Sequence, residues 1–177
     1  MATTNHRKLP VGIQSFVEIR KRDYLYVDKT DIVWELVNGV KYNYLSRPRR
    51  FGKSVLVDTL QAYFEGRREL FEGLKIMALE QEWQSYPVLR LDMSRGGASE
   101  ASLRSYLDLA FSRYEEKYAV TVRPNASLAT RFDSILLAAY QQTKQQVVVL
   151  IDEYDAPLQH SWHTQEHEAC TTLYREV

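Results

Sequence analysis

A Gly-Lys-Ser tripeptide at residues 52–54 is the feature that most constrains the fold of this chain. It lies between the β-like run "KYNYLS" at 41–46 and the segment "VLVDTLQAYF", whose apolar residues have helical spacing. A turn between a strand and a helix directs backbone N–H groups and the positive end of the helix toward a bound phosphate. The sequence therefore predicts a phosphate-binding loop between a strand and a helix.

The pattern gives each residue of the tripeptide a chemical role. Gly52 lets the backbone approach a phosphate, Lys53 reaches the β- and γ-phosphates, and the Ser54 hydroxyl binds Mg²⁺. Nearby guanidinium groups add donors for phosphate oxygens. The candidate nucleotide-binding residues are Arg49, Arg50, Phe51, Gly52, Lys53 and Ser54.

The loop departs from the GxxxxGK(S/T) pattern at its first position, where Arg47 replaces glycine and Pro48 follows. A non-glycine residue in a left-handed conformation costs about 1–2 kcal/mol. A solvated basic turn, in which Ser54 merely begins a helix, is therefore the alternative reading of the same residues. The loop alone does not decide between the two.

A second motif, "VVVLIDEYD" at 147–155, supplies the carboxylates that nucleotide hydrolysis needs. The run of apolar residues predicts a strand buried on both faces, as in a parallel sheet. At its end, we expect Asp152 on the Mg²⁺ side and Glu153 on the γ-phosphate side as catalytic base. Asp155, just before Pro157, is better explained as a helix cap.

The remaining segments alternate between helices and strands. Apolar spacing predicts a short helix in 28–39, a strand in 86–94, and helices near 100–118 and 127–144. The alternation predicts an α/β fold, here a P-loop NTPase-type three-layer sandwich with a mostly parallel sheet. We expect one domain over 1–177, with a lead-in at 1–40 and a nucleotide-binding core at 41–177.

Charge and composition indicate the class of protein and its location. Residues 1–60 hold 11 Lys and Arg against 6 Asp and Glu, and residues 61–177 hold 12 against 17. This split could steer an anionic ligand toward the first third but does not predict nonspecific nucleic-acid binding. The first residues contain no apolar stretch of the length that a signal peptide needs, and the longest aliphatic run is "VVVLI" at 147–151, so we expect neither export nor a membrane span. The single Cys170 excludes an internal disulfide. We expect a cytoplasmic protein that does not contact membranes.

Two histidines near the end of the chain have the spacing of metal ligands. His163 and His167, four residues apart, would share one face of a helix close to Cys170. A fourth ligand is missing, and the HExxH pattern is not present. An exposed polar helix is the better interpretation, and we assign no metal there.

With both motifs considered, the chain resembles the AAA-ATPase-like family, a divergent branch of the P-loop ATPases. The resemblance is carried by "LPVGIQSFVEIR", "YLYVDKT", "RPRRFGKSVLVDTLQAYFEGRRELFEGL" and "VVLIDEYDAPL". It implies that an arginine-rich loop is usual in the family, and it implies ATP and Mg²⁺ as ligands. Lys53 and Glu153 are then the catalytic residues, and Ser54 and Asp152 hold the metal.

The resemblance also implies elements beyond the second motif. Family members place a sensor strand after that motif and often carry a PD-(D/E)XK nuclease-like domain toward the carboxyl end. Because only a helix-like tail follows here, we expect a truncated fold that is incomplete at its C-terminus. A homo-oligomer, or contact with a nuclease-like domain or nucleic acid in the full-length protein, is a further expectation.

The leading functional hypothesis is an ATP-binding module that hydrolyses ATP with Mg²⁺ when the chain is complete. The alternatives are a non-catalytic nucleotide switch that regulates a partner or an appended domain, and a nucleic-acid-binding module that uses no nucleotide.

Overall fold

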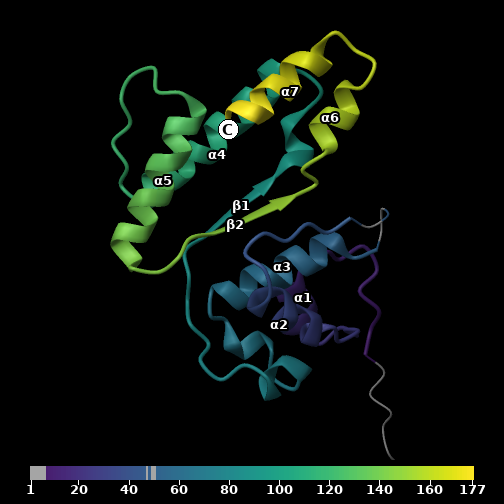
Figure 1. Ribbon diagram of the computed structural model, residues 1–177. Helices are drawn as coiled ribbons and strands as arrows, with labels where there is room; N and C mark the ends of the chain where they lie inside the picture. Colours follow the sequence, from purple (N-terminus) through teal and green to yellow (C-terminus); the bar gives the residue numbers. More distant parts are fainter. Residues whose placement is uncertain (1–6, 47, 49–50) are drawn as a thin grey trace, which may run out of the picture. The chain divides into compact units, whose positions relative to one another are not determined.

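The computed structural model describes residues 7–46, 48 and 51–177. The chain forms two compact units, unit 1 (Met1–Ser85) and unit 2 (Tyr86–Val177). Within the described residues the fold is α/β, with seven α-helices and one two-stranded parallel sheet (Figure 1). The division into two units describes how the residues pack and does not test whether the chain folds as one domain. The single domain over 1–177 therefore stays a prediction.

Unit 1 is helical and packs around a small aromatic core. Its elements are α1 (Phe16–Lys21), α2 (Thr30–Asn38), α3 (Lys53–Phe64) and the 3₁₀ turns η1 (Arg68–Leu70) and η2 (Lys75–Ala78). Its buried apolar residues are Phe16, Val33, Ala62, Tyr63, Leu70, Phe71 and Ile76. The predicted helix in 28–39 is confirmed as α2, whose C-cap is Gly39.

Polar contacts join the helices of unit 1. The hydroxyl of Ser15, the N-cap of α1, donates to Asp58 Oδ2 on α3 at 3.1 Å. Asp28 accepts from the backbone N–H of Thr30 at 2.9 Å and from that of Lys75 at 2.8 Å. These hydrogen bonds, together with desolvation that opposes them, leave the pKa of Asp28 below its usual value. Asp28 therefore has a structural role in fixing the start of α2 against η2.

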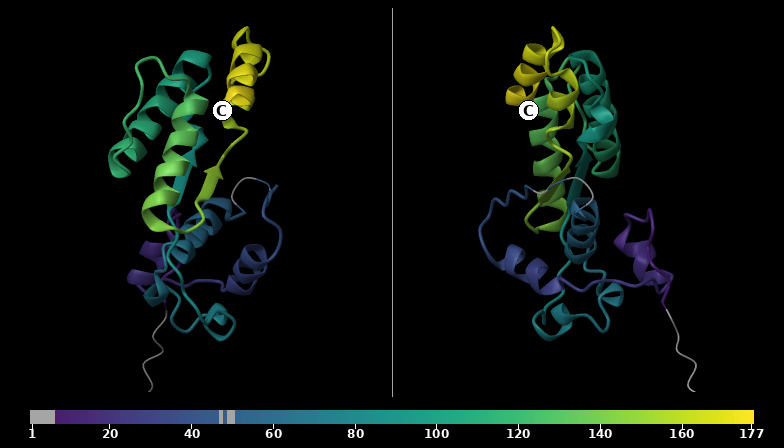
Figure 2. Two further views of the ribbon diagram at one scale, coloured as in Figure 1. Left: turned by 60° about the vertical axis from the view of Figure 1, so that its left-hand side comes forward. Right: turned by 90° about the vertical axis from the view of Figure 1, so that its right-hand side faces the viewer.

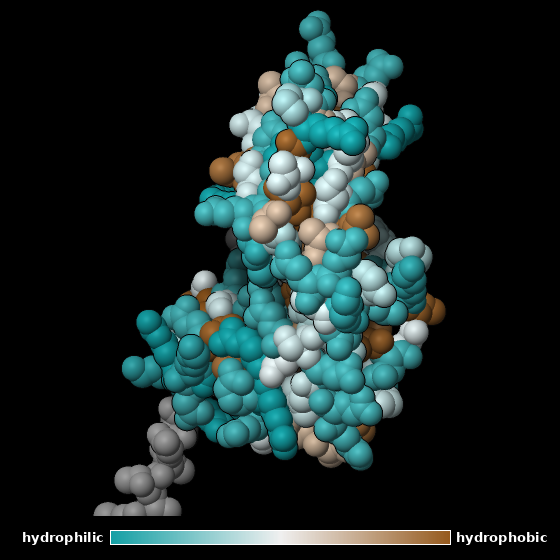
Figure 3. Space-filling view, turned by 90° about the vertical axis from the view of Figure 1, so that its left-hand side faces the viewer, coloured by the Kyte–Doolittle hydropathy of each residue, from teal (hydrophilic) through white to brown (hydrophobic). Residues whose placement is uncertain are grey.

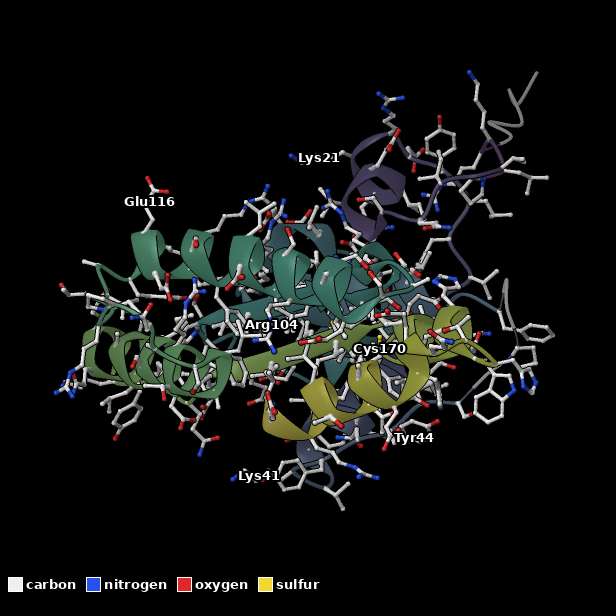
Figure 4. The ribbon with its side chains drawn as sticks, turned by 90° about the horizontal axis from the view of Figure 1, so that it is seen from above. Lys21, Lys41, Tyr44, Arg104, Glu116 and Cys170 are labelled. Carbon is white, nitrogen blue, oxygen red and sulfur yellow. The ribbon has the colours of Figure 1, made fainter. Side chains whose placement is uncertain are left out.

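The predicted strand at 41–46 is wrong, because the described residues there are irregular. Tyr42 is 83% exposed, Tyr44 70% and Leu45 37% (Tyr44 is labelled in Figure 4). A strand needs a neighbouring strand to pair with its backbone N–H and C=O groups. The described part of unit 1 has no strand that could pair with this segment.

Unit 2 contains the sheet and the longer helices. Its elements are β1 (Val88–Asp92), η3 (Met93–Gly96), α4 (Glu100–Lys117), α5 (Leu128–Thr143), β2 (Val148–Asp152), α6 (Ala156–Ser161) and α7 (Glu166–Glu176). These bounds confirm the predicted strand in 86–94 and both predicted long helices. The core joins β1, α4, α5 and α7 through Leu89, Leu91, Met93, Leu103, Leu107, Phe111, Tyr118, Leu128, Ile135, Ala139, Cys170 and Leu173.

Strands β1 and β2 run side by side and in the same direction, as Figures 1 and 2 show. Arg90 lies opposite Leu150, and Asp92 lies opposite Asp152. The carboxyl ends of both strands therefore carry an aspartate at the same edge of the sheet. Since alternate residues of a strand face opposite sides, Arg90 shares a face with both aspartates.

Two tyrosines of α4 close the outer edge of β1. The Arg90 N–H donates to the Tyr114 hydroxyl at 2.7 Å, and that hydroxyl donates to the Arg90 carbonyl at 3.0 Å. The Asp92 N–H donates to the Tyr106 hydroxyl at 2.7 Å. Burial raises the pKa of the Tyr106 phenol, so it stays protonated. Further strands can therefore pair with the sheet of unit 2 only along β2.

The prediction that β2 is buried on both faces is wrong for this structure. Its side chains alternate, with Val149 36% exposed and Ile151 49% exposed. Within unit 2, β2 pairs with β1 alone. The continuous apolar run is what a central strand would have, but here one side of the strand lacks a covering layer. By contrast, the surface of unit 2 over α5 is mostly hydrophilic (Figure 3).

Candidate nucleotide-binding site

The first half of the candidate site is the loop that enters α3. Gly52 has φ 77° and ψ 21°, a left-handed conformation, and it is the N-cap of the helix. A Cβ atom added there would meet nothing within 4 Å. The backbone at Gly52 is therefore open to the close approach of a ligand, and its conformation favours glycine.

Lys53 and Ser54 form the start of α3. The first helical hydrogen bond runs from the Leu56 N–H to the Gly52 carbonyl at 3.0 Å. The N–H groups of the first turn therefore point out of the amino end of the helix, where the helix dipole favours an anion. Both side chains are partly exposed. The predicted ligands Arg49 and Arg50, and also Arg47, lie outside the described residues, and Phe51 is 64% exposed.

The second half of the candidate site is the carboxyl end of β2. Asp152 is 6% exposed, and its Oδ1 accepts from the Glu153 N–H at 3.0 Å. Glu153 has φ 49°, a left-handed conformation that non-glycine residues rarely adopt. Such strain is often found at functional sites. Since successive residues of a strand face opposite sides, we expect the carboxylates of Asp152 and Glu153 to leave its end in different directions.

Asp155 and Pro157 begin the helix after this turn, as predicted. Asp155 is the N-cap of α6, although its side chain makes no capping hydrogen bond to the backbone. Its Oδ2 accepts instead from Gln159 Nε2 at 2.5 Å. Asp155 therefore faces its own helix and is not a further candidate ligand.

Sequence reasoning missed two side chains at this end of the sheet. Arg90 Nη2 lies 3.9 Å from Asp152 Oδ2, and Asp92 stands opposite Asp152 in the register. The Asp92 Oδ1 accepts from the backbone and hydroxyl of Ser94, which fixes it as the N-cap of η3. The available signal was the arginine within the apolar run "VLRLD", because a charged residue in a buried strand requires a partner.

The histidines near the carboxyl end do not form the predicted shared helix face. His163 lies before α7 with φ 64°, and His167 is in the helix. His167 Nδ1 lies 3.3 Å from the Ser161 hydroxyl. No group of three or more His, Cys, Asp or Glu that could hold a metal occurs among the residues that the structure describes.

A polar hollow of about 430 Å³ lies between α4 and α7. It is lined by Glu100, Arg104, Gln165, Glu168, Ala169, Thr172, Leu173 and Glu176 (Figure 4 labels Arg104 on α4 and Cys170 on α7). Its three carboxylates would repel a triphosphate. The charge of its lining therefore does not suit a nucleotide, and no motif residue lines it.

The chemistry of the motif residues fits Mg·ATP. The Ser54 hydroxyl and the Asp152 carboxylate are hard oxygen donors, which Mg²⁺ prefers. The open backbone at Gly52 and the amino end of α3 suit a phosphate. The oxygen donors and the open helix start are therefore compatible with a phosphate and Mg²⁺.

Comparison with known proteins shows the family of the chain. The family pattern described as "Predicted AAA-ATPase" matches residues 10–176. The chain belongs to the AAA-ATPase-like family. Both motifs of this AAA-ATPase-like chain lie within the matched range. Membership indicates a predicted AAA-type ATPase with nucleotide and metal use, which agrees with the resemblance in sequence.

One curated relative of this AAA-ATPase-like chain is a protein of Azotobacter chroococcum mcd 1, described as "Uncharacterized protein in vnfD 5'region". The two are 36% identical over 156 residues, which cover 87% of this chain and 30% of the relative. The chain thus spans under a third of that protein's length. No solved structure matches. No helix in the described part of the chain is long and apolar enough to cross a membrane.

Proposed function

We propose that the chain is an ATP-binding module whose complete protein hydrolyses ATP with Mg²⁺. The observation that carries the proposal is the left-handed Gly52, open to close approach, which leads directly into α3 with Lys53 and Ser54 in its first turn. Membership of a family of predicted AAA-type ATPases supports it. The whole protein's activity is part of this proposal.

The proposed roles follow the chemistry of phosphoryl transfer to water. Lys53 and the amino end of α3 hold the β- and γ-phosphates, with Arg49, Arg50 and Phe51 flanking them. Ser54 and Asp152 would hold Mg²⁺, which when bound would neutralise charge on the phosphate oxygens. Together these groups stabilise the charge that develops as the bond to the leaving ADP breaks.

Glu153 is the proposed catalytic base. Its carboxylate accepts a proton from water as the water oxygen bonds to the γ-phosphorus and ADP leaves. Successive residues at the end of a strand direct their side chains to opposite sides, and Glu153 follows Asp152 directly. The two neighbouring carboxylates can therefore perform separate tasks.

The finer fold that accompanies this function is a P-loop three-layer sandwich with a mostly parallel sheet. In support, β1 and β2 are parallel, and tyrosines close the outer edge of β1. The exposed apolar side chains of β2 are typical of a parallel strand whose second face is covered by a further layer of helices. A homo-oligomer, a nuclease-like domain and a cytoplasmic location belong to the same proposal and need the full-length protein for their tests.

Calorimetric titration with Mg·ATP, together with a phosphate-release assay, tests the function. We expect saturable binding by the wild type and at least about tenfold weaker binding by Lys53→Ala, because a charge-assisted phosphate contact is lost. Glu153→Gln should retain binding and lose about 10²-fold or more in turnover, since a general base contributes that much. The control is Lys144→Ala, at an exposed lysine that is the C-cap of α5. This variant should bind Mg·ATP as the wild type does.

Each alternative has its own signature in these assays. Equal binding by the wild type and Lys53→Ala contradicts the proposal. Binding without phosphate release by the full-length protein would favour a nucleotide switch. Steeply salt-dependent DNA binding that ATP does not alter would favour a nucleic-acid-binding module.

A further inference from the structure

The carboxylate of Asp152 is buried beside a single described cation. It is 6% exposed, and Arg90 Nη2 lies 3.9 Å from its Oδ2. This separation is an ion-pair distance that is too long for a direct hydrogen bond. A buried carboxylate requires a compensating charge, because desolvation disfavours its ionised form. Arg90 supplies that charge in unit 2.

The position of Arg90 is fixed by the structure around it. Its backbone N–H and carbonyl both bond to the Tyr114 hydroxyl of α4. It stands two residues before Asp92, which is the residue opposite Asp152, and its side chain lies on the same face of the sheet. The guanidinium therefore extends diagonally across the sheet toward Asp152 from an anchored backbone.

We propose that Arg90 is a positioning residue that pairs with Asp152 in the ligand-free protein and competes with Mg²⁺ for its carboxylate. This inference rests on the proposed function, in which Asp152 is a magnesium ligand. The guanidinium and Mg²⁺ are both cations near one carboxylate, so the presence of Arg90 opposes metal binding. Arg90 thereby sets how strongly Mg²⁺ tightens the binding of ATP.

The test compares ATP affinity in EDTA and in excess Mg²⁺ for the wild type and Arg90→Gln. The ratio of the two dissociation constants measures how far Mg²⁺ favours binding. We expect the Arg90→Gln variant to have the same ATP dissociation constant as the wild type in EDTA. In excess Mg²⁺ it should bind ATP about tenfold more tightly than the wild type. A role confined to folding would weaken binding in both conditions. Arg113→Gln, at an exposed arginine of α4, is the matched control.

Stability of the ligand-free protein provides a second readout. Arg90→Gln should lower the melting temperature because it leaves a buried carboxylate uncompensated. Adding Asp152→Asn to that variant should restore most of the loss, since the double variant has no unpaired charge. Additive losses in these variants would overturn the pairing.

The outcomes separate this inference from the proposed function. Suppose that the wild type binds Mg·ATP, and that Mg²⁺ tightens ATP binding by Arg90→Gln no more than it tightens binding by the wild type. Only the role of Arg90 is then overturned. Weaker binding of ATP by Arg90→Gln in both EDTA and Mg²⁺ would indicate a role in folding or in phosphate binding, and either would also overturn the proposed role of Arg90. If the wild type does not bind Mg·ATP at all, the proposed function fails and this inference fails with it.

Discussion

Gly52 and Gly73 in unit 1 have nearly the same positive φ angle, 77° and 76°. A Cβ atom at either position would meet nothing within 4 Å. The two residues differ in their surroundings: Gly52 is the N-cap of α3, and Gly73 is in the turn between η1 and η2. This pair allows the cost of a strained backbone to be separated from a role in binding.

We expect Gly52→Ala and Gly73→Ala to destabilise the protein by about 1 kcal/mol each, because alanine disfavours the left-handed conformation. Only Gly52→Ala should weaken Mg·ATP binding, by about tenfold, since a shifted backbone would displace the N–H groups that face the phosphate. Thermal unfolding measures the first effect and calorimetric titration the second. Equal affinities in the two variants would count against a phosphate-binding role for this loop.

The sequence shows the motif residues more clearly than the residues that support them. Lys53, Ser54, Asp152 and Glu153 stand in patterns whose spacing reflects a defined chemistry. Arg90 belongs to no pattern, because its role depends on which strand lies beside β1 and in which register. A single sequence does not contain that pairing, so Arg90 emerged only from the structure.

At the scale of elements, the predictions succeeded where the structure is local. Both long helices of unit 2 were expected from apolar spacing and begin at serine caps, Ser99 and Ser127. The predicted strand at 41–46 and the full burial of β2 were wrong. Strand formation and strand burial depend on neighbours that are distant in the sequence, and apolar runs do not specify them.

The edge of β1 provides a test at this scale. Tyr114→Phe removes the hydroxyl that bonds to both backbone groups of Arg90, and these groups are then left unsatisfied. We expect a loss of about 1–3 kcal/mol in the free energy of unfolding, measured by urea denaturation. Tyr140→Phe on α5, where the side chain is 50% exposed, should change it by less than about 0.5 kcal/mol. Similar losses in the two variants would show that the hydroxyl does not support the strand.

At the scale of the whole molecule, the two motifs belong to different compact units. Lys53 and Ser54 are in unit 1, and Asp152 and Glu153 are in unit 2. The proposed function assigns Ser54 and Asp152 to one Mg²⁺ ion. The proposal that Ser54 and Asp152 bind the same ion can be tested by whether the effects of two substitutions on Mg²⁺-dependent ATP binding add.

If both residues bind one metal ion, their effects on Mg²⁺-dependent ATP binding should not add. Ser54→Ala and Asp152→Asn should each reduce the tightening of ATP binding by Mg²⁺ about tenfold or more, and the double variant should lose little beyond the larger single effect. Dissociation constants in EDTA and in Mg²⁺ provide the measurement. The control is Asp133→Asn, at an exposed position of helix α5. Asp133 is far in sequence from both proposed metal ligands and is not part of strand β2, so its effect should be additive with that of Ser54→Ala. Full additivity of Ser54→Ala with Asp152→Asn would mean that the two residues do not share an ion.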